Sequence, residues 1–326
     1  MAREMPKPRF IEVGRPVAPV AITVDLNWQR VVEFLRSREL SANTCKAYER
    51  QLRQFYEWLE HKPWQEVSHR DIDRYKQYLK GLPSKRGGPL SPGTINQAIA
   101  TLKSFFKWLT VKDYISRNPT LTIEMVKEPA KPPADLADEQ VNALFDALSY
   151  RGQSEVRDRA ILHVLDHGLR ANEVSKLDVQ DYDGRRLGIR DAKWGSDGLV
   201  PLKPRAISAL DSYLGWMVRQ GLPTTPESPL FVSLSNNSKG KRLKYRGVYD
   251  LVKDLAESSE LEGVHPHRMR HTFATSIVKA GMNPMLAKRA TRISSDRVFA
   301  RYSDRALDMK MEEAFNELYG QPLDTQ

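Results

Sequence analysis

The second half of the chain contains five residues whose side chains could together carry out phosphate chemistry: His267, Arg270, Tyr302, Arg170 and Lys193. His267 and Arg270 are three positions apart and follow Pro266, a residue suited to the first turn of a helix. Residues at that spacing share a helix face, and a helix N-terminus favours bound anions. With a well-placed tyrosine as nucleophile, such a group can cut DNA without a metal ion.

Two neighbours could support these side chains. Glu173 follows Arg170 by three residues and can hold its guanidinium through an ion pair, and His271 shares a helix face with His267. Each feature also has an ordinary structural explanation. An exposed ion pair contributes little to stability, a lysine in a turn is usually only solvated, and a single tyrosine is more often part of a core. The chemistry therefore depends on whether the fold brings these residues together.

The composition is that of a basic globular protein. The chain has 326 residues, of which 40% are hydrophobic and 28% charged, which is typical of about two domains with ample core-forming material. The formal net charge of +10 favours a polyanionic partner, with nucleic acid as the first candidate. Since many basic proteins bind no nucleic acid, the charge alone does not decide the partner.

The single cysteine and the N-terminal sequence indicate a cytoplasmic protein. Cys45 cannot form an internal disulfide, which is consistent with a reducing cytosol. Residues 1–20 are rich in proline and charge and lack the apolar segment of a secretory signal. No run of about 18 apolar residues could span a membrane. No cluster of residues demands a metal ion, and we expect neither a metal nor another cofactor.

The first half of the chain predicts an all-helical domain. Apolar residues recur at helical spacing in four segments, and Ser41 and Ser91 are suited to cap the second and the fourth. The segments are Trp28–Arg38, a helix after Ser41 that extends to Leu59, Asp71–Leu79, and Gly93 to about Leu109. Four basic residues here are candidates for contacts with DNA phosphates, although a solvated helix face is an equally good interpretation. They are Lys85, Arg86, Lys103 and Lys107.

Residues 127–135 predict a boundary between two domains. This segment contains three prolines and mixed charges, a composition typical of a semi-rigid exposed linker. We therefore expect a flexible leader over residues 1–24, a helical domain over 25–126, the linker over 127–135 and a second domain over 136–326.

The second domain predicts helices around one small β-hairpin. Two short apolar runs between Arg186 and Leu202 flank a turn that contains Gly195 and Gly198. Helical periodicity begins at Asp138 and returns in five later segments: Ala206–Val218, Val248–Ala256, Pro266–Lys279, Pro284–Ala290 and Leu307–Leu318. The expected fold is mainly α with a small β-sheet.

Several motifs occur in a fixed order along almost the whole chain. They are Leu40-Ser41-x-x-Thr44-x-x-x-Tyr48, Phe105-Phe106-x-Trp108-Leu109, Gly168-Leu169-Arg170-x-x-Glu173, Ala192-Lys193 before Leu199-Val200-Pro201-Leu202, His267-x-x-Arg270-His271-Thr272, and Tyr302. Together they resemble the motifs of the tyrosine recombinase (phage integrase) family. The resemblance implies a two-domain DNA clamp, with an all-helical, SAM-like core-binding domain and a mixed α/β catalytic domain.

The resemblance also implies a reaction, namely site-specific breakage and rejoining of DNA through a 3′-phosphotyrosine made by Tyr302. Arg170 and Arg270 would hold the phosphate and stabilise the charge of the transition state. Lys193 would protonate the leaving 5′-oxygen, and His267 would assist proton transfer. No ATP is needed, because the phosphotyrosine conserves the bond energy.

One position departs from the family pattern. In most relatives a histidine or tryptophan precedes the tyrosine by about nine positions, where this chain has Ile293. Arg292, directly before it, is a candidate to take that role, and His271 is a second candidate for support. The alternative is that the site works without such a residue.

By the same resemblance, double-stranded DNA is the expected partner, and a homotetramer on DNA is the expected assembly. The terminal helix from Leu307 to Leu318 could dock on a neighbouring protomer or pack on its own domain. An accessory protein or a second recombinase is a further candidate partner. The leader before Trp28 is too short for an arm-binding domain, which favours a simple Xer-like or transposon-resolution type.

Two other functions remain open. A DNA-binding protein on the same fold that no longer cuts is suggested by Ile293. A type IB topoisomerase-like enzyme would use similar arginine, lysine, histidine and tyrosine chemistry, although the core-binding motifs argue against it.

Overall fold

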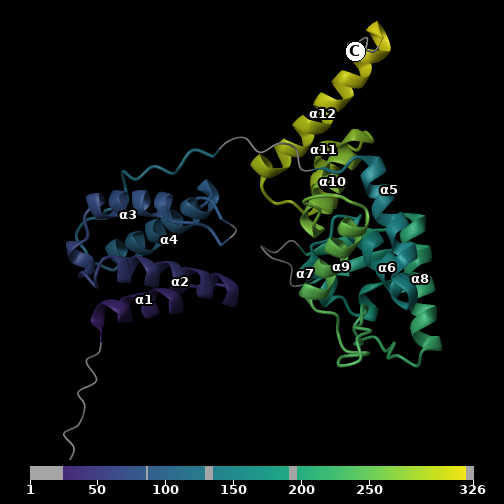
Figure 1. The fold of residues 1–326 in the computed structure, drawn as a ribbon, viewed down its shortest axis with the longest axis horizontal. Coiled ribbons are helices and arrows are strands. Elements are labelled where there is room, and N and C mark those ends of the chain that lie inside the picture. The colour runs from purple at the N-terminus through teal and green to yellow at the C-terminus, as the bar shows by residue number, and fades with distance from the viewer. Residues whose placement is uncertain (1–24, 86, 129–134, 191–196, 321–326) are drawn as a thin grey trace, which may run out of the picture. The chain divides into compact units, whose positions relative to one another are not determined.

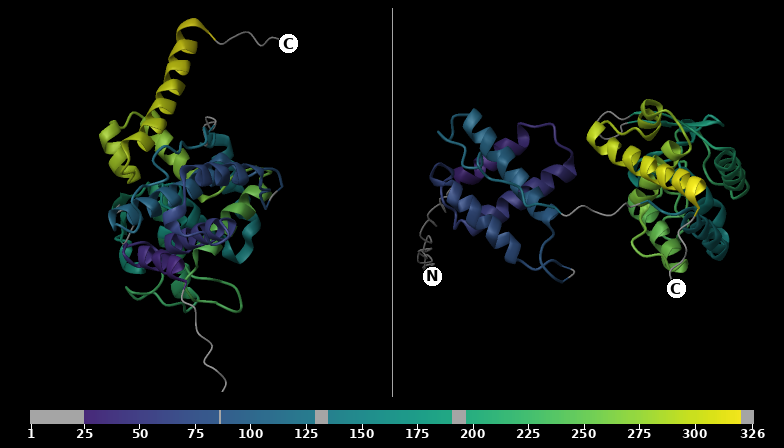
Figure 2. Two further views of the ribbon diagram at one scale, coloured as in Figure 1. Left: turned by 90° about the vertical axis from the view of Figure 1, so that its left-hand side faces the viewer. Right: turned by 90° about the horizontal axis from the view of Figure 1, so that it is seen from above.

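The computed structural model describes residues 25–85, 87–128, 135–190 and 197–320, which belong to two compact units (Figure 1 and Figure 2). Unit 1 is Met1–Ala130 and unit 2 is Lys131–Gln326. The division between them falls within residues 127–135, where the composition predicts a linker. The predicted leader, residues 1–24, and most of the predicted linker, residues 129–134, lie outside the described residues.

The described part of unit 1 is helical, as predicted. Its elements are α1 (Leu26–Arg36), α2 (Ala42–Trp58), a short 3₁₀ turn (Trp64–Glu66), α3 (His69–Gly81) and α4 (Pro92–Val111). Ser41 and Ser91 cap α2 and α4 as expected. The hydroxyl of each serine accepts a hydrogen bond from the backbone N–H three residues later, at 3.2 Å in both cases.

The core of unit 1 is rich in aromatic side chains. Phe55 is fully buried and packs edge-on against Tyr75, with ring centroids 4.8 Å apart, and Trp64 packs in the same way against Phe105 at 5.1 Å. α4 contributes nine buried residues to this core. Because α4 is fixed along its length, basic residues on its outer side have a well-defined position.

Unit 2 contains the other described helices and the small sheet. The helices are α5 (Asp138–Asp146), α6 (Glu155–Leu165), α7 (Ala171–Lys176), α8 (Pro204–Arg219), α9 (Tyr245–Ser258), α10 (Pro266–Lys279), α11 (Pro284–Thr291) and α12 (Asp296–Tyr319), with 3₁₀ turns at Ala147–Ser154 and Val179–Asp181. Strands β1 (Arg186–Ile189) and β2 (Gly198–Pro201) pair antiparallel, with Leu187 opposite Val200. The predicted fold, mainly α with a small β-sheet, is confirmed.

Three helices differ from the sequence-based prediction. α6 and α7 are not predicted, because α6 is buried on nearly all sides and so lacks a one-sided apolar pattern, and α7 has only six residues. The last helix is predicted to begin at Leu307, whereas α12 begins at Asp296 after the N-cap Ser295. Tyr302 therefore lies within a helix.

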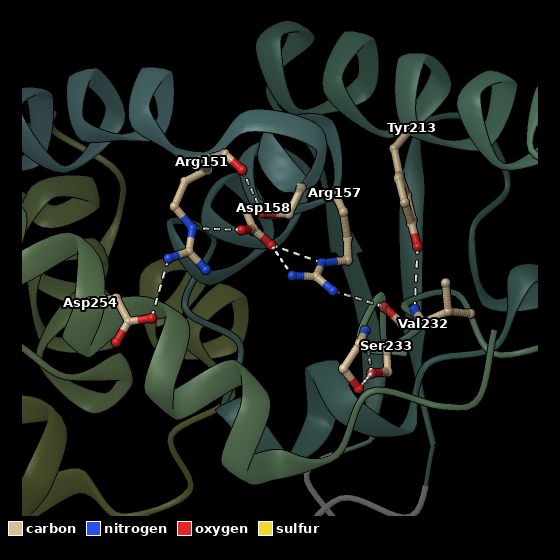
Figure 3. Close-up of polar contacts among 9 residues, drawn as sticks. Arg151, Arg157, Asp158, Tyr213, Val232, Ser233 and Asp254 are labelled. Carbon is tan, nitrogen blue, oxygen red and sulfur yellow. Dashed lines mark hydrogen bonds and ion pairs between the residues drawn. The ribbon is translucent and has the colours of Figure 1, made fainter. Parts of the chain in front are cut away.

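Buried charges on α6 fix the centre of unit 2 (Figure 3). The carboxylate of Asp158 is fully buried and accepts hydrogen bonds from Arg157 and from Nε of Arg151, the latter at 2.9 Å. Arg157 also donates to the carbonyl of Val232 at 3.1 Å, and Arg151 pairs with Asp254 of α9 at 3.2 Å. Removal of Asp158 would leave the guanidinium of Arg157, which is only 10% exposed, without its carboxylate. This network therefore holds α6, whose end leads directly into the first arginine motif.

Across the parts of the chain that the structure describes, no helix is both long and apolar enough to cross a membrane. The same residues contain no group of three or more histidine, cysteine, aspartate or glutamate side chains that could hold a metal ion.

Candidate active site

The first arginine motif lies at the N-terminus of α7. Arg170 is the N-cap residue of this helix, and its backbone N–H donates to Oε2 of Glu173 at 2.8 Å. Its guanidinium Nη1 donates to Oε1 of the same carboxylate at 2.6 Å. The predicted ion pair is therefore present. The Arg170 side chain is 31% exposed and that of Glu173 only 6%, so a buried carboxylate holds a guanidinium that solvent can reach.

Gly168 brings this motif close to α10. Its φ of +75° lies in the left-handed region, and a Cβ at this position would lie 2.5 Å from Cδ1 of Phe273. The preceding residue, His167, is buried and bonded at both ring nitrogens. Nδ1 lies 2.7 Å from the carbonyl of His163, and Nε2 accepts from the backbone N–H of Lys203 at 2.9 Å. His167 therefore has a structural role.

Arg270 on α10 is held by backbone carbonyls. Its Nη1 donates to the carbonyl of Gly168, and its Nη2 donates to the carbonyls of Thr291 and Arg292. Arg270 lies on the helix that also carries His267, as the spacing predicts, but only 3% of Arg270 is exposed. Burial, with repulsion from the charge of Arg170, lowers the pKa of Arg270 to about 10, which leaves it charged at neutral pH.

His267, His271 and Tyr302 form a continuous row of rings. The ring centroids of His267 and His271 are 4.6 Å apart, and those of His271 and Tyr302 are 5.1 Å apart. His267 lies at the surface, and partial burial together with the charge of Arg270 lowers its pKa. Burial and the neighbouring His267 lower the pKa of His271 to about 4. Both imidazoles are therefore neutral at pH 7.

Tyr302 lies in the first half of α12, packed against α10. It is 9% exposed and belongs to a small apolar cluster that includes Ala274, Val278 and Phe299. Burial raises the pKa of Tyr302, and the nearby charges of Arg270 and Arg301 offset this only in part. The phenol is therefore protonated at neutral pH.

Arg292 and Ile293, the two residues where the sequence departs from the family pattern, have different surroundings. Ile293 is 9% exposed and packs in the apolar cluster with Tyr302. Arg292 ends α11 in the left-handed conformation, with φ 54°, and its Nη2 donates to Oε2 of Glu173 at 2.8 Å. Burial alone would raise the pKa of Glu173, but the charge of Arg292 and the hydrogen bonds from both arginines lower it. Arg292, not Ile293, therefore contacts the polar site.

Lys193 lies outside the described residues, although β1 and β2 on either side of it form the predicted hairpin. Among the proposed DNA contacts, Arg86 is also outside the described residues. Lys85, before α4, and Lys107, on α4, are exposed, and Lys103 is half-buried on α4.

A polar cluster beside Glu173 is not anticipated from the sequence. A depression of about 390 Å³ is lined by Glu173, Lys176, Asp178 and Arg190 among others. Asp178 pairs with Arg190 at 3.2 Å and also with Arg242. Because Arg190 and Arg242 are each bound to carboxylates, we read this cluster as structural support for α7. No sequence motif marks it, since its members are 12 and 64 positions apart.

Comparison with known proteins places this geometry in a family. The model of the phage integrase family matches residues 134–307, and the model of the phage integrase N-terminal SAM-like domain matches residues 30–113. The chain belongs to the phage integrase family. It is 32% identical over 268 residues to the tyrosine recombinase XerC of Roseiflexus castenholzii, covering 78% of this chain and 82% of that protein. It is 31% identical over 315 residues to a tyrosine recombinase of Synechococcus elongatus, covering 92% of this chain and 94% of that protein. The predicted enzyme class, a tyrosine recombinase, is confirmed, and of the two predicted types these relatives support the Xer-like one.

Solved structures of this family share the fold. The XerH site-specific recombinase, solved as a post-cleavage complex with a palindromic difH substrate, gives a TM-score of 0.69 at 20% identity and covers 89% of this chain and 84% of that one. The Tn1549 transposon integrase in complex with circular intermediate DNA gives a TM-score of 0.66 at 23% identity and covers 86% of this chain and 98% of that one.

Proposed function

We propose that this protein breaks and rejoins double-stranded DNA at specific sites with Tyr302 as the nucleophile. The Tyr302 hydroxyl oxygen forms a bond to the scissile phosphorus, and the bond from that phosphorus to the 5′-oxygen breaks. The products are a 3′-phosphotyrosine and, after protonation of the leaving oxygen, a 5′-hydroxyl. Attack by a 5′-hydroxyl of another strand reverses these steps and rejoins the DNA without a cofactor.

The convergence of three segments on Arg270 carries this proposal. Its guanidinium bonds the carbonyl of Gly168, two residues before Arg170, and the carbonyl of Thr291, which precedes α12. The charge of Arg270 also acts on the hydroxyl of Tyr302. One buried cation thus links the segments that contain the exposed arginine and the nucleophile.

The two arginines are suited to hold the scissile phosphate. Arg170 is partly exposed and oriented by Glu173, so it can approach a non-bridging oxygen without a change of backbone. Fixed guanidinium groups that face developing negative charge lower the barrier because they need no reorganisation.

A proton must leave Tyr302 and another must reach the 5′-oxygen. The neutral imidazoles of His267 and His271 can accept a hydrogen bond, and the ring of His271 neighbours both the ring of His267 and the ring of Tyr302. We assign assistance of the tyrosine proton to His267, with His271 as support. We assign protonation of the 5′-oxygen to Lys193, on the family resemblance alone.

Contacts with the DNA backbone are proposed for both units. The solved relatives with the same fold are complexes with DNA, and the net charge of +10 favours such a partner. In unit 1 we propose that Lys85, Arg86, Lys103 and Lys107 contact phosphates. The domain limits proposed for this function are residues 25–126 for core binding and 136–326 for catalysis, joined by residues 127–135 and preceded by the leader.

Strand exchange between two duplexes needs four such sites, so we propose a homotetramer on DNA. The second half of α12 supports this assembly, because Leu307, Met311, Phe315 and Leu318 are all more than half exposed. Figure 1 shows α12 extending beyond α10 and α11. We further propose that the enzyme acts in the cytoplasm, which its single cysteine, Cys45, favours. We also propose that an accessory protein or a second recombinase can take part.

The decisive experiment uses a DNA site selected by the purified protein from a random duplex library. A duplex with this site and a nick next to the scissile position is incubated with wild-type protein and with Tyr302→Phe. We expect a covalent protein–DNA adduct that survives denaturation with wild type, and none with Tyr302→Phe, while both bind the duplex equally.

An adduct with Tyr302→Phe would reject Tyr302 as the nucleophile. Tight binding by wild type without any adduct would favour the DNA-binding protein that no longer cuts. Relaxation of supercoiled plasmid without preference for the selected site would favour the topoisomerase-like alternative.

A further inference from the structure

Arg292 is a buried cation whose hydrogen-bonding capacity is only partly used. Its side chain is 5% exposed, and Nη2 donates to Oε2 of Glu173 at 2.8 Å. Among the described residues, neither Nε nor Nη1 of Arg292 has a hydrogen-bond partner, although both atoms are buried. A guanidinium offers five donors, and buried donors without acceptors are costly. The site therefore retains donors that suit an acceptor from outside the chain.

The charges around Glu173 favour an anionic acceptor. Arg170 and Arg292 bond the two oxygens of this single carboxylate, and Arg270 contacts the carbonyl of Arg292. The charges of Arg170 and Arg292 both act on Arg270. Within the described part of the chain, Arg170 and Arg292 bond this one carboxylate and Arg270 adds a third positive charge beside them, so positive charge predominates here. A phosphodiester supplies both the negative charge and the oxygen acceptors.

The backbone of Arg292 is adapted to this placement. A non-glycine residue at φ 54° is unusual, and here the left-handed turn ends α11 and directs the side chain toward Glu173. The stem of the side chain passes Gly198 at the start of β2, where an added Cβ would lie 3.7 Å from Cδ of Arg292. The side chain of Arg292 therefore lies between Glu173 of the arginine motif and Gly198 of β2.

We infer that Arg292 is a third phosphate-binding arginine, whose unpartnered donors bind a non-bridging oxygen of the scissile phosphate. This inference rests on the proposed function and deepens it. At the position where most relatives have a histidine or tryptophan, this chain buries an isoleucine and uses the preceding arginine instead.

A double-mutant cycle separates direct phosphate binding from an effect through Glu173. The full-length proteins are wild type, Arg292→Gly, Glu173→Gln and the double variant, and the readout is single-turnover cleavage of the nicked duplex. Glycine suits the left-handed backbone at 292. We expect Arg292→Gly to slow cleavage on the order of 100-fold, as for loss of one transition-state donor. We expect a similar further loss when it is added to Glu173→Gln.

If the double variant cleaves as fast as Glu173→Gln alone, Arg292 acts only by positioning Glu173 and the inference is wrong. Arg289→Gln is the matched control, because Arg289 is an exposed basic residue on the same helix, and it should cleave like wild type. If Arg292→Gly does not fold, Arg292→Lys provides a second test. It keeps the charge beside Glu173 but loses the planar set of donors, so cleavage should still fall.

A second measurement needs no cleavage and no DNA. Inorganic phosphate should raise the melting temperature of wild type and of Arg289→Gln by clearly more than that of Arg292→Gly, which keeps only Arg170 and Arg270 as phosphate ligands. An equal rise in all three proteins would overturn the inference even if Tyr302 forms its adduct. Absence of the adduct from wild type, with the phosphate effect intact, would reject the proposed function and leave the anion site standing.

Discussion

At the scale of single residues, the position of Gly168 imposes two requirements that only glycine can meet. Its φ of +75° is strained for any side chain, and the ring of Phe273 occupies the space that a Cβ would need. Its carbonyl also accepts a hydrogen bond from Arg270. The position of the first arginine motif relative to α10 therefore depends on the absence of a Cβ at residue 168.

We expect Gly168→Ala to lower the free energy of unfolding by about 2–4 kcal/mol, because backbone strain and overpacking add. Urea denaturation followed by circular dichroism measures this change. Gly184→Ala is the matched control, since Gly184 has φ +86° but no atom within 4 Å of an added Cβ. It should lose only about 1 kcal/mol. Equal losses in both variants would show that Phe273 yields easily.

Two half-buried histidines, His163 and His271, predict that stability falls with acidification. Burial lowers the pKa of His163 and of His271 to about 4, so between about 6.5 and 4 the unfolded chain binds more protons than the folded one. The free energy of unfolding should therefore decrease as the pH falls through this window, by about 1–2 kcal/mol per histidine after allowance for solvent screening. Urea denaturation at pH 7.5, 6.0 and 4.5 measures the trend.

His163→Gln is the informative variant for this pH effect. It removes one titrating group outside the candidate site, so the dependence on pH should become shallower by one histidine. An unchanged slope would mean that the imidazole of His163 stays hydrated in the folded protein.

Among the candidate residues, the local pair was predictable and the distant contacts were not. Arg170 and Glu173 are three positions apart, so their ion pair follows from helix geometry. The burial of Arg270 depends on carbonyls 102 and 21 positions away, which no local pattern records. The same holds for Arg292, whose carboxylate partner is 119 positions away.

At the scale of elements, α12 has two halves with different surroundings. The first half contains Tyr302 and packs on α10, whereas the second half has apolar side chains that remain largely exposed. Lys279 and Glu313 form one ion pair between this second half and α10, at 2.6 Å. An exposed apolar helix face of this kind commonly marks an interface with a partner.

We expect deletion of residues 307–326 to leave the fold of unit 2 intact and to weaken assembly on DNA. None of the side chains of residues 307–320 is buried, so the melting temperature should fall by only a few degrees. Light scattering on the selected duplex measures the number of protomers bound. Phe315→Asp is a milder version that tests the same surface. Unchanged assembly in both variants would exclude this helix from the interface.

Amphipathic helices were the predictable part of the fold. Those with a one-sided apolar pattern, such as α2, α4 and α10, agree closely with the structure, and serine caps fixed two of the starts. α6 escaped prediction because tertiary packing surrounds it, and α7 because six residues hold less than two turns. The start of α12 was missed because only Phe299, Tyr302 and Ala306 of its first half are buried, which is a sparse apolar pattern.

At the scale of the whole molecule, the charge balance predicts a strong effect of salt on DNA affinity. Each lysine–phosphate contact releases about one counterion, so the slope of log affinity against log salt counts these contacts. Lys103→Ala and Lys107→Ala should each reduce the magnitude of this slope by about 1. Fluorescence anisotropy at several salt concentrations provides the measurement.

Lys253→Ala is the control for this prediction, because Lys253 pairs with Glu257 on α9 at 2.8 Å and is not a proposed contact. Its slope should equal that of wild type. A loss of slope in Lys253→Ala as large as in Lys107→Ala would show that total charge, not placement on α4, determines the salt effect.

The backbone clamp on Arg270 has a consequence for how such an enzyme can diverge. A carbonyl oxygen is present whatever side chain a residue has, so substitutions at Thr291 or Arg292 leave both acceptors available to the guanidinium. Only a change that moves the main chain can release it. The sequence around this arginine can therefore drift during evolution, and new residues such as Arg292 can enter the neighbourhood without displacing the cation on which the site is built.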